Sequence, residues 1–460
     1  MTPTIFIIFG ATGDLFQRKI LPALQSLRVK GLLPKRFAIV AYGRRALDDP
    51  GFRTFVEHAV SSVDDDFLSH LTYVRGEFAD KEGYARLKFH CDGIDSRFGQ
   101  CTNKLFYCAV PPEHYSSIFK GLALSGLTIP CSEETGWTRI LVEKPFGKDI
   151  ATARALDRDL GRSFKETQIF RIDHYLAKET IRNILTFRAS NPLFQSAWSR
   201  EHVKEVEITL FERLDVSGRA DFYDGVGALR DVGQNHLLQM LALISMELPS
   251  DLTTSTSSSL IRAARAKALS AVRPSSSAAD YLRGQYEGFR SERGVAKDSD
   301  TETFFSLVAE VRTSRFKGVP FRISSGKALH AGIAEIKVVF KNTIDQQVNT
   351  LTFRIQPHEA ITLSMQMKKP GFDFETITTP LSFEYAGLPQ HRISEAYEKV
   401  LFDAIVGDQT LFASTPEVEA GWNFVTAASG YMKKNPLVVY QKGSTPADII
   451  EDSIAIKTSA

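Results

Sequence analysis

A short apolar run that ends in glycines constrains the fold of this chain most. Residues 4–9 are apolar and rich in β-branched side chains, and they lead directly into Gly10-Ala11-Thr12-Gly13-Asp14-Leu15. Apolar residues then recur at helical spacing from Asp14 to about Lys30, and a second apolar run follows at Phe37–Tyr42. This order predicts a strand, a tight turn, a helix and a second strand parallel to the first, joined by a right-handed crossover.

The pattern changes after about 200 residues. Apolar runs at Leu105–Val110 and Thr138–Val142 fit later strands of the same parallel sheet. From Val203 onward few crossover helices separate the strands, which is typical of a mainly antiparallel sheet. The strands expected there are Val206–Phe211, Phe304–Arg312, Ile333–Phe340 and Asn349–Gln356. We therefore expect an α/β Rossmann domain over residues 1–175, followed over residues 176–460 by an α+β domain with a large mainly antiparallel sheet.

Composition excludes several classes of partner. The 460 residues carry 56 basic and 54 acidic side chains, so the overall charge favours neither nucleic acid nor an anionic membrane. No apolar run approaches membrane-spanning length, and the start reads as a strand instead of a leader. The four cysteines have no metal-ligand spacing, and we expect no metal, a reducing compartment and a cytoplasmic location. A Ser/Thr-rich segment at 253–259 is expected at the surface.

The first turn is predicted to bind a dinucleotide. Glycines between a strand and a helix let the backbone approach a pyrophosphate, which the N–H groups at the helix start then bind. After the second strand, where an NAD-binding fold places an acidic residue, the sequence has Gly43-Arg44-Arg45. Two isolated arginines would indicate a solvated loop, but at this distance from the glycine turn they favour the 2′-phosphate of NADP. The use of NAD as well stays open, because a guanidinium also stacks on adenine.

Three polar clusters could carry chemistry. The first is Glu143-Lys144-Pro145, in which Lys144 emerges at the carboxyl end of a parallel strand, where ligands bind in such sheets. The second is Asp173-His174-Tyr175 with Lys178, and on a helix His174 and Lys178 would share a face and could reach one phosphate. The third extends from Asp231 to His236.

His236 has two interpretations. The spacing predicts a helix over about 229–246 in which His236 shares a stripe with Val232 and Met240 and not with Asp231, which alone would indicate a core histidine. A nucleotide-binding end together with a buried histidine and a carboxylate, however, is the minimum set for alcohol oxidation. Hydride departure needs a base that removes the alcohol proton, and histidine has a suitable pKa.

These residues resemble a known family, the glucose-6-phosphate dehydrogenases. The most specific stretches are Arg171–Lys178, Arg230–Met240 and Gly326-Lys327-Ala328-Leu329, and the likeness extends from the glycine turn to about Phe412. It implies NADP-dependent oxidation of glucose 6-phosphate at C1 to 6-phosphogluconolactone, the first oxidative step of the pentose phosphate pathway. It also implies a homodimer built on the large sheet.

The resemblance assigns a role to each candidate residue. His236 would be the general base, and Asp173 would orient it and stabilise the imidazolium. Residues implied in binding the sugar phosphate are Lys144, His174, Tyr175, Lys178, Glu212, Asp231, Lys327 and Gln356. Residues implied in binding NADP are Gly10, Thr12, Gly13, Asp14, Leu15, Arg44 and Lys144.

One departure from the family leaves alternatives open. Relatives commonly place a second cation for substrate five residues beyond Lys327, where this chain has Gly332. A catalytically altered or silent relative is therefore one alternative. Another is an NADP-linked sugar oxidoreductase of the glucose-fructose oxidoreductase type, which also has Glu-Lys-Pro after a strand, but the Asp173–Lys178 set favours the first family. A redox switch between Cys101 and Cys108 would need a facing geometry that spacing does not show.

Overall fold

The chain forms two compact units. The computed structural model describes residues 1–60, 63–132, 136–250, 257–341, 348–387 and 394–458. The first unit comprises Met1–Ala177 and Ser394–Thr415, and the second comprises Lys178–Ile393 and Pro416–Ala460. The chain thus returns to the first unit for a short segment late in the sequence, which the division after residue 175 did not include.

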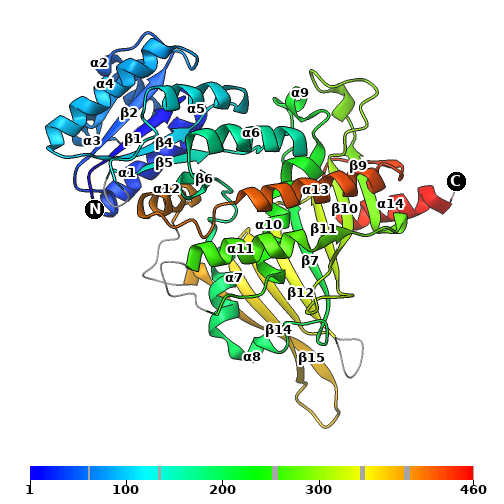
Figure 1. Ribbon diagram of the computed structural model, residues 1–460. Helices are drawn as coiled ribbons and strands as arrows, with labels where there is room; N and C mark the ends of the chain where they lie inside the picture. Colours follow the sequence, from blue (N-terminus) through cyan, green and yellow to red (C-terminus); the bar gives the residue numbers. More distant parts are fainter. Residues whose placement is uncertain (61–62, 133–135, 251–256, 342–347, 388–393, 459–460) are drawn as a thin grey trace. The chain divides into compact units, whose positions relative to one another are not determined.

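The first unit, in blue and cyan in Figure 1, contains a six-stranded parallel sheet. Its strand order is β3-β2-β1-β4-β5-β6. This order confirms the expected Rossmann-type fold. The strands are β1 (Thr4–Phe9), β2 (Phe37–Gly43), β3 (Leu71–Arg75), β4 (Asn103–Cys108), β5 (Thr138–Val142) and β6 (Ile169–Arg171). The helices are η1 (Phe16–Ile20), α1 (Leu21–Val29), α2 (Asp49–Ala59), α3 (Asp65–Ser69), α4 (Lys81–Phe98), η2 (Pro112–His114), α5 (Tyr115–Leu124), α6 (Ile150–Ser163), η3 (Glu166–Gln168) and α12 (Ala396–Val406).

Burial on both faces explains the continuous apolar run at the start of the chain. Every residue of β1 is buried. Phe6 and Ile8 belong to a core that includes residues of α1, α2 and α12. The ring of Phe9, on the other face, lies 6.2 Å from that of Tyr84 in α4. Because helices cover both faces, the strand has no solvent side that would call for alternating polar residues.

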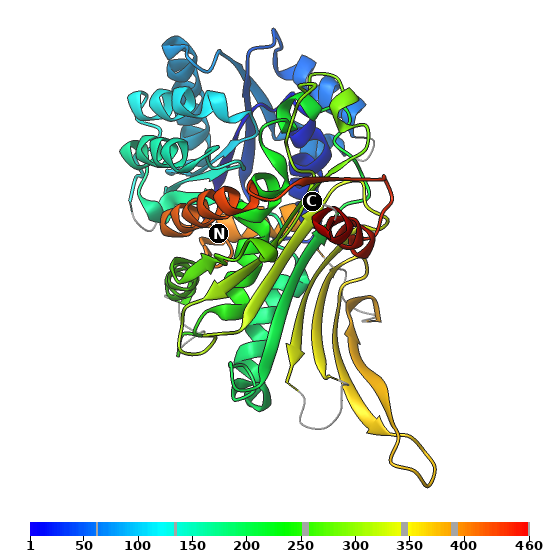
Figure 2. The same cartoon turned by 90° about the vertical axis from the view of Figure 1, so that its right-hand side faces the viewer.

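The second unit is built on a ten-stranded, mostly antiparallel sheet, as predicted (Figure 2). Its order is β15-β14-β13-β12-β7-β11-β10-β9-β16, with β8 paired to β10, and only β7–β11 and β9–β16 are parallel pairs. The strands are β7 (Val203–Phe211), β8 (Val272–Pro274), β9 (Tyr281–Tyr286), β10 (Phe304–Val311), β11 (Pro320–Gly326), β12 (Ile333–Phe340), β13 (Thr350–Gln356), β14 (Ala360–Lys368), β15 (Thr376–Glu384) and β16 (Leu437–Tyr440). The helices are α7 (Glu179–Ser190), α8 (Pro192–Gln195), α9 (Ala220–Tyr223), η4 (Leu229–Leu237), α10 (Leu238–Ser245), α11 (Ser257–Ser270), η5 (Ala278–Asp280), η6 (Phe289–Ser291), η7 (Tyr385–Gly387), α13 (Thr415–Met432) and α14 (Pro446–Thr458).

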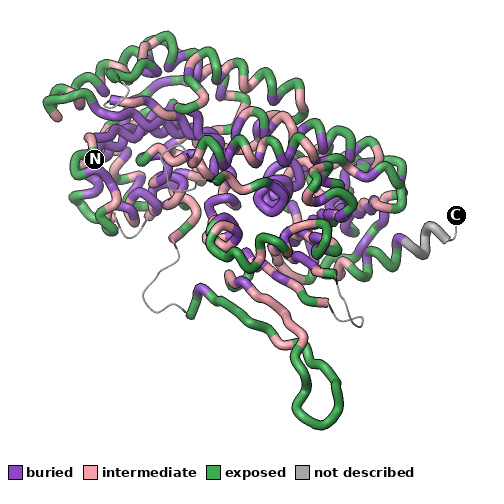
Figure 3. The backbone as a smooth tube through the Cα atoms, turned by 60° about the horizontal axis from the view of Figure 1, so that its bottom comes forward, coloured by how far each residue is buried: buried purple, intermediate pink, exposed green. Residues whose placement is uncertain are grey.

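Helices cover only part of this sheet. Phe353 of β13 is fully buried, and its ring packs edge-on against Phe187 of α7 with 5.4 Å between the centroids. Beneath the helices, the fully buried Arg265 of α11 forms an ion pair of 2.7 Å with Glu417 of α13. Helices no longer cover the sheet at its β14–β15 edge. Almost all residues of β15 are exposed, as Figure 3 shows.

The cysteines differ from expectation. Cys101 forms a disulfide with Cys131, and their Cα atoms are 6.6 Å apart. Cys108, which the sequence analysis weighed as the partner of Cys101, is a buried free thiol in β4, as is Cys91 in α4. Thirty residues separate the bonded pair, and the two loops that carry it precede neighbouring strands, so only the tertiary fold brings the thiols together. The expected reducing, cytoplasmic compartment stays a prediction.

Two further observations concern the described residues. None of their helices combines the length and apolar character needed to cross a membrane. They also contain no group of three or more His, Cys, Asp or Glu side chains arranged to hold a metal ion. Most of the Ser/Thr-rich segment, residues 253–256, lies outside the described part of the chain, and residues 257–259 begin α11.

Candidate active site

The turn after β1 has the geometry expected of a pyrophosphate site. Gly10 has a φ of +84°, in the left-handed region that favours glycine, and its carbonyl accepts a 2.9 Å hydrogen bond from the Gly13 N–H. A Cβ atom on Gly10 would lie 2.4 Å from the carbonyl oxygen of Ala109, after β4. A helix then begins at Asp14, as predicted, although residues 16–20 form a π-helical segment that the apolar spacing did not reveal.

The end of β2 carries cations and no carboxylate. Arg44 is exposed directly after the strand, and the guanidinium of Arg45 lies 5.3 Å from the ring centre of Phe55. The carboxylate of Asp14, one of the predicted cofactor-binding residues, forms an exposed 2.6 Å ion pair with Arg18. An open glycine turn with arginines at the neighbouring strand end fits a dinucleotide that carries a 2′-phosphate.

The end of β5 places Lys144 beside an unusual carboxylate. Glu143 accepts a 2.6 Å hydrogen bond from the hydroxyl of Tyr107, and its carbonyl accepts one of 3.0 Å from the hydroxyl of Tyr115. Desolvation raises the pKa of Glu143, and the Tyr107 hydroxyl and the Lys144 ammonium oppose that rise. Sequence reasoning grouped Glu143 with Lys144 but gave it no role.

The segment after β6 is a turn and not a helix on which His174 and Lys178 could share a face. Oδ1 of the buried Asp173 accepts a 3.0 Å hydrogen bond from the N–H of Tyr175, and its carbonyl accepts one from the N–H of Leu176. An aspartate that bonds the backbone two residues on stabilises a turn in place of a helix. His174 and Lys178 therefore do not share a helical face, because α7 begins only at Glu179 with Lys178 as its N-cap. Within the first unit, the His174 ring lies 5.1 Å from that of Tyr175 and 6.5 Å from that of Tyr397, which the sequence did not single out.

In the second unit three predicted sugar-binding residues form one ion cluster. β7 and β11 are parallel neighbours with Phe211 opposite Gly326, so Glu212 and Lys327 leave the sheet at the same end. Lys327 is 2% exposed, and its ammonium contacts the Glu212 carboxylate and lies 3.1 Å from Oδ2 of Asp231. The ring of Tyr223, which the sequence analysis missed, lies 5.8 Å from the same ammonium.

The helix that carries Asp231 and His236 starts in π-helical geometry. Residues Leu229–Leu237 form η4, and α10 continues it. In a π-helix the hydrogen bonds join residues five apart, so side chains are spaced around the axis differently from the α-helix assumed from the sequence. Within this segment His236 follows Asp231 by five residues, and Val232 and His236 are both buried. His236 is 2% exposed, which agrees with the predicted burial.

Gln356 and Gly332 lie at strand ends of the same sheet. Gln356 ends β13, where it is half-buried and pairs with Ala334 of β12. Gly332 immediately precedes β12, and a Cβ atom there would meet only the carbonyl oxygen of Phe211, at 3.8 Å. A side chain could be accommodated at Gly332, so glycine is not required there for lack of space.

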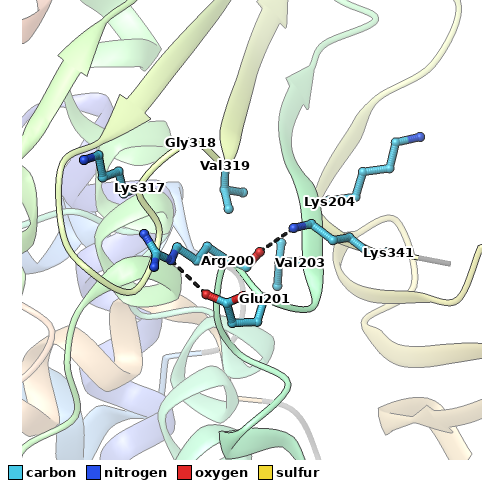
Figure 4. Close-up of a pocket in the computed structure, with 8 residues that line it drawn as sticks. All are labelled: Arg200, Glu201, Val203, Lys204, Lys317, Gly318, Val319 and Lys341. Carbon is cyan, nitrogen blue, oxygen red and sulfur yellow. Dashed lines mark hydrogen bonds and ion pairs between the residues drawn. The ribbon is translucent and has the colours of Figure 1, made fainter. Parts of the chain in front are cut away.

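A basic cavity in the second unit is separate from this cluster (Figure 4). It measures about 280 Å³ and lies at the beginning of β7 and β11, whereas Glu212 and Lys327 follow the ends of these strands. Within it, Arg200 is paired to Glu201 at 2.9 Å and the Lys341 ammonium donates to the carbonyl of Arg200 at 2.6 Å. None of the predicted site residues lines it. Its lining comprises Arg200, Glu201, Val203, Lys204, Lys317, Gly318, Val319 and Lys341.

Comparison with known families accounts for nearly the whole chain. Residues 7–183 match the family description "Glucose-6-phosphate dehydrogenase, NAD binding domain", and residues 185–458 match "Glucose-6-phosphate dehydrogenase, C-terminal domain". The chain belongs to the glucose-6-phosphate dehydrogenase family. This confirms the resemblance seen in the sequence.

Individual members of the family agree over full length. The glucose-6-phosphate 1-dehydrogenase of Aggregatibacter actinomycetemcomitans is 38% identical over 98% of this chain and 95% of its own, and that of Treponema pallidum is 36% identical over 99% and 94%. A solved structure described as glucose-6-phosphate dehydrogenase in complex with its substrate glucose-6-phosphate is 32% identical, covers 98% of this chain and 97% of its own, and has a TM-score of 0.89. An enzyme of the same name from Mycobacterium avium gives a TM-score of 0.82 at 28% identity.

The glycine turn yields a testable prediction. Gly10→Ala should weaken NADP binding about 100-fold, because the added methyl group must displace the backbone at Ala109 and with it the turn. Fluorescence titration with NADP measures the dissociation constant, and circular dichroism verifies folding. Gly31→Ala is the matched control, since Gly31 also has a positive φ of 68° but nothing within 4 Å of an added Cβ. Equal losses in both variants would contradict a specific role of Gly10.

Proposed function

We propose that this chain oxidises glucose 6-phosphate at C1 with NADP and forms 6-phosphogluconolactone. The observation that carries the proposal is the cluster of Lys327, Glu212 and Asp231, with the buried His236 on the same helical segment as Asp231. Family membership and the glycine turn with its neighbouring arginines supply the nucleotide half of the reaction. Gly332, which stands where relatives commonly have a cation, is the one feature that favours a catalytically silent relative. All the residues that the resemblance assigns to the site are present.

The chemistry divides between the nucleotide and the protein. Bound NADP would supply the acceptor for the hydride, which leaves C1 with both electrons of the C–H bond. We assign the remaining proton, on O1, to the imidazole of His236, since a neutral histidine is a competent base near neutral pH. In the reacting complex, Asp173 is assigned to orient the ring and to stabilise its positive charge after proton transfer. One hydride and one proton leave the sugar, which balances oxidation of the hemiacetal to the lactone.

The two ends of the sugar phosphate need different partners. Glu212 and Asp231 can accept hydrogen bonds from sugar hydroxyls while the Lys327 ammonium offers donors, and Gln356 can supply either an acceptor or a donor. We assign His174, Tyr175 and Lys178 to the phosphate, because each can donate to its oxygens. Lys144 is assigned to the sugar and the nucleotide together.

The proposed base gives the sharpest test of this mechanism. His236→Asn should lower kcat by about 10²- to 10⁴-fold and leave the KM for glucose 6-phosphate nearly unchanged, because a base acts mainly in the transition state. Steady-state absorbance of reduced nicotinamide measures both constants. His202→Asn, which changes an exposed histidine of the same unit, should have no effect. A rise in KM with unchanged kcat would make His236 a binding residue.

We further propose that the protein is a homodimer that uses the apolar face of the β14–β15 ribbon. The register pairs Leu363 with Leu381 and Ile361 with Phe383 on one face. Leu381 and Phe383 are 53% and 42% exposed, although their face continues from the helix-covered core at Phe353. A second copy of the same ribbon would bury side chains that are otherwise in water.

The face predicted for the dimer can be tested with adjacent residues of one strand. Leu381→Lys should yield monomers, because an ammonium group would be buried in an apolar contact. Ser382→Lys, which points to the opposite face where its hydroxyl contacts that of Thr362 at 3.0 Å, should remain dimeric. Analytical ultracentrifugation gives the mass of each. A monomeric parent protein, or a dimeric Leu381→Lys variant, would overturn the assignment.

A further inference from the structure

The helix that carries Asp231 and His236 has no cap of its own. Helical structure begins at Gly227, and no side chain next to the start of η4 makes a capping hydrogen bond. The first turn of any helix leaves backbone N–H groups without a partner inside the helix, and they need acceptors elsewhere when buried.

A single distant residue supplies two of these acceptors. The N–H of Leu229 donates to Oε1 of Glu302 at 3.1 Å, and the N–H of Ala228 donates to the carbonyl oxygen of Glu302 at 3.0 Å. Glu302 is 8% exposed and lies two residues before β10. Its charge also suits this place, since the N-terminal end of a helix favours a carboxylate.

The fit around this carboxylate is tight. Gly227 has a φ of +77°, and a Cβ atom on it would lie 2.4 Å from Oε1 and 2.5 Å from Cδ of Glu302. Desolvation raises the pKa of Glu302, while the N–H groups of Glu302 and Leu229 and the charge of Arg230 lower it. The backbone at Gly227–Leu229 thus both encloses the carboxyl group and donates a hydrogen bond to it.

The residues on either side of Glu302 hold two more parts of the site. Thr303 accepts a 2.9 Å hydrogen bond from the N–H of Lys327 through its carbonyl oxygen. Thr301 accepts a 2.8 Å hydrogen bond from the N–H of Gly225 through Oγ1. Three consecutive residues therefore contact the loop before η4, the first turn of the helix and the lysine at the centre of the ion cluster.

We propose that Glu302 is a positioning residue for the oxidation reaction. By capping the helix from outside it, Glu302 fixes where η4 begins, and so sets the position of Asp231, which contacts Lys327, and of His236 on the same segment. Without the cap the first turn can unwind or shift, which would displace both side chains. This inference rests on the proposed role of His236 as the base.

The test compares Glu302→Ala with Glu302→Gln in the full-length protein. Activity is expressed per folded site, which NADP titration counts. Glu302→Ala should lower kcat/KM for glucose 6-phosphate by about 10- to 100-fold, because small displacements of reacting groups have effects of this size. The KM for NADP should stay unchanged, since the glycine turn belongs to the first unit and Glu302 to the second. Glu302→Gln keeps an oxygen acceptor for Leu229 and should restore most of the lost kcat/KM.

A glycine pair gives an independent variant with a matched control. Gly227→Ala inserts a methyl group against the Glu302 carboxylate and should reproduce the kinetic loss of Glu302→Ala. Gly225→Ala has the same backbone strain, with a φ of +78°, but no atom lies within 4 Å of its added Cβ. It should lose much less kcat/KM per folded site. Equal losses at the two glycines would overturn the proposal.

Other outcomes separate this inference from the mechanism on which it rests. If Glu302→Ala only reduces the amount of folded protein and kcat/KM per site is unchanged, then Glu302 serves stability alone and the proposal fails. The His236→Asn variant is measured in the same series. If His236→Asn retains full turnover, the assignment of His236 as the base fails. If His236→Asn is inactive while Glu302→Ala is fully active, only the positioning role of Glu302 is rejected.

Discussion

The part of the proposed site that lies in the second unit depends on the ion cluster around Lys327. An ammonium that is almost fully buried is stable only where carboxylates compensate its charge, and here Glu212 and Asp231 do so from two different elements. The cluster therefore ties the ends of two parallel strands to the helix of the proposed base. Two carboxylates around one lysine leave a net negative charge with acceptors to spare, which suits a ligand rich in hydroxyl groups.

Features carried by local patterns were predictable from the sequence. The run from Ile5 to Phe9 is apolar because helices cover both faces of its sheet, and the glycine turn follows from the close approach of Gly10 to Ala109. The scarcity of crossover helices after Val203 correctly indicated a mainly antiparallel sheet. The members of the ion cluster were named by resemblance, and the proximity of Glu212 to Lys327 follows from the parallel register of β7 and β11.

The errors arose where hydrogen bonding or long-range contacts decide the outcome. The apolar spacing around His236 suits an α-helix, and nothing in it shows that the backbone bonds in π geometry. The Asp173 side chain competes for backbone N–H groups and forms a turn where spacing suggested a helix. Tyr397 and the bond between Cys101 and Cys131 depend on segments that are distant in the chain. In the sequence Glu302 is one polar residue before a strand. Only its hydrogen bond from the N–H of Leu229 shows that it caps the start of η4.

The measurement that tests the central claim most directly is absorbance of reduced nicotinamide with purified protein, NADP and glucose 6-phosphate. Parallel reactions contain NAD, free glucose and other sugar phosphates. We predict rapid reduction of NADP with glucose 6-phosphate and a far slower reaction with free glucose, which lacks the phosphate group assigned to His174, Tyr175 and Lys178. Silence with every sugar phosphate, while NADP still binds, would contradict the proposed activity and leave the family assignment to the fold alone.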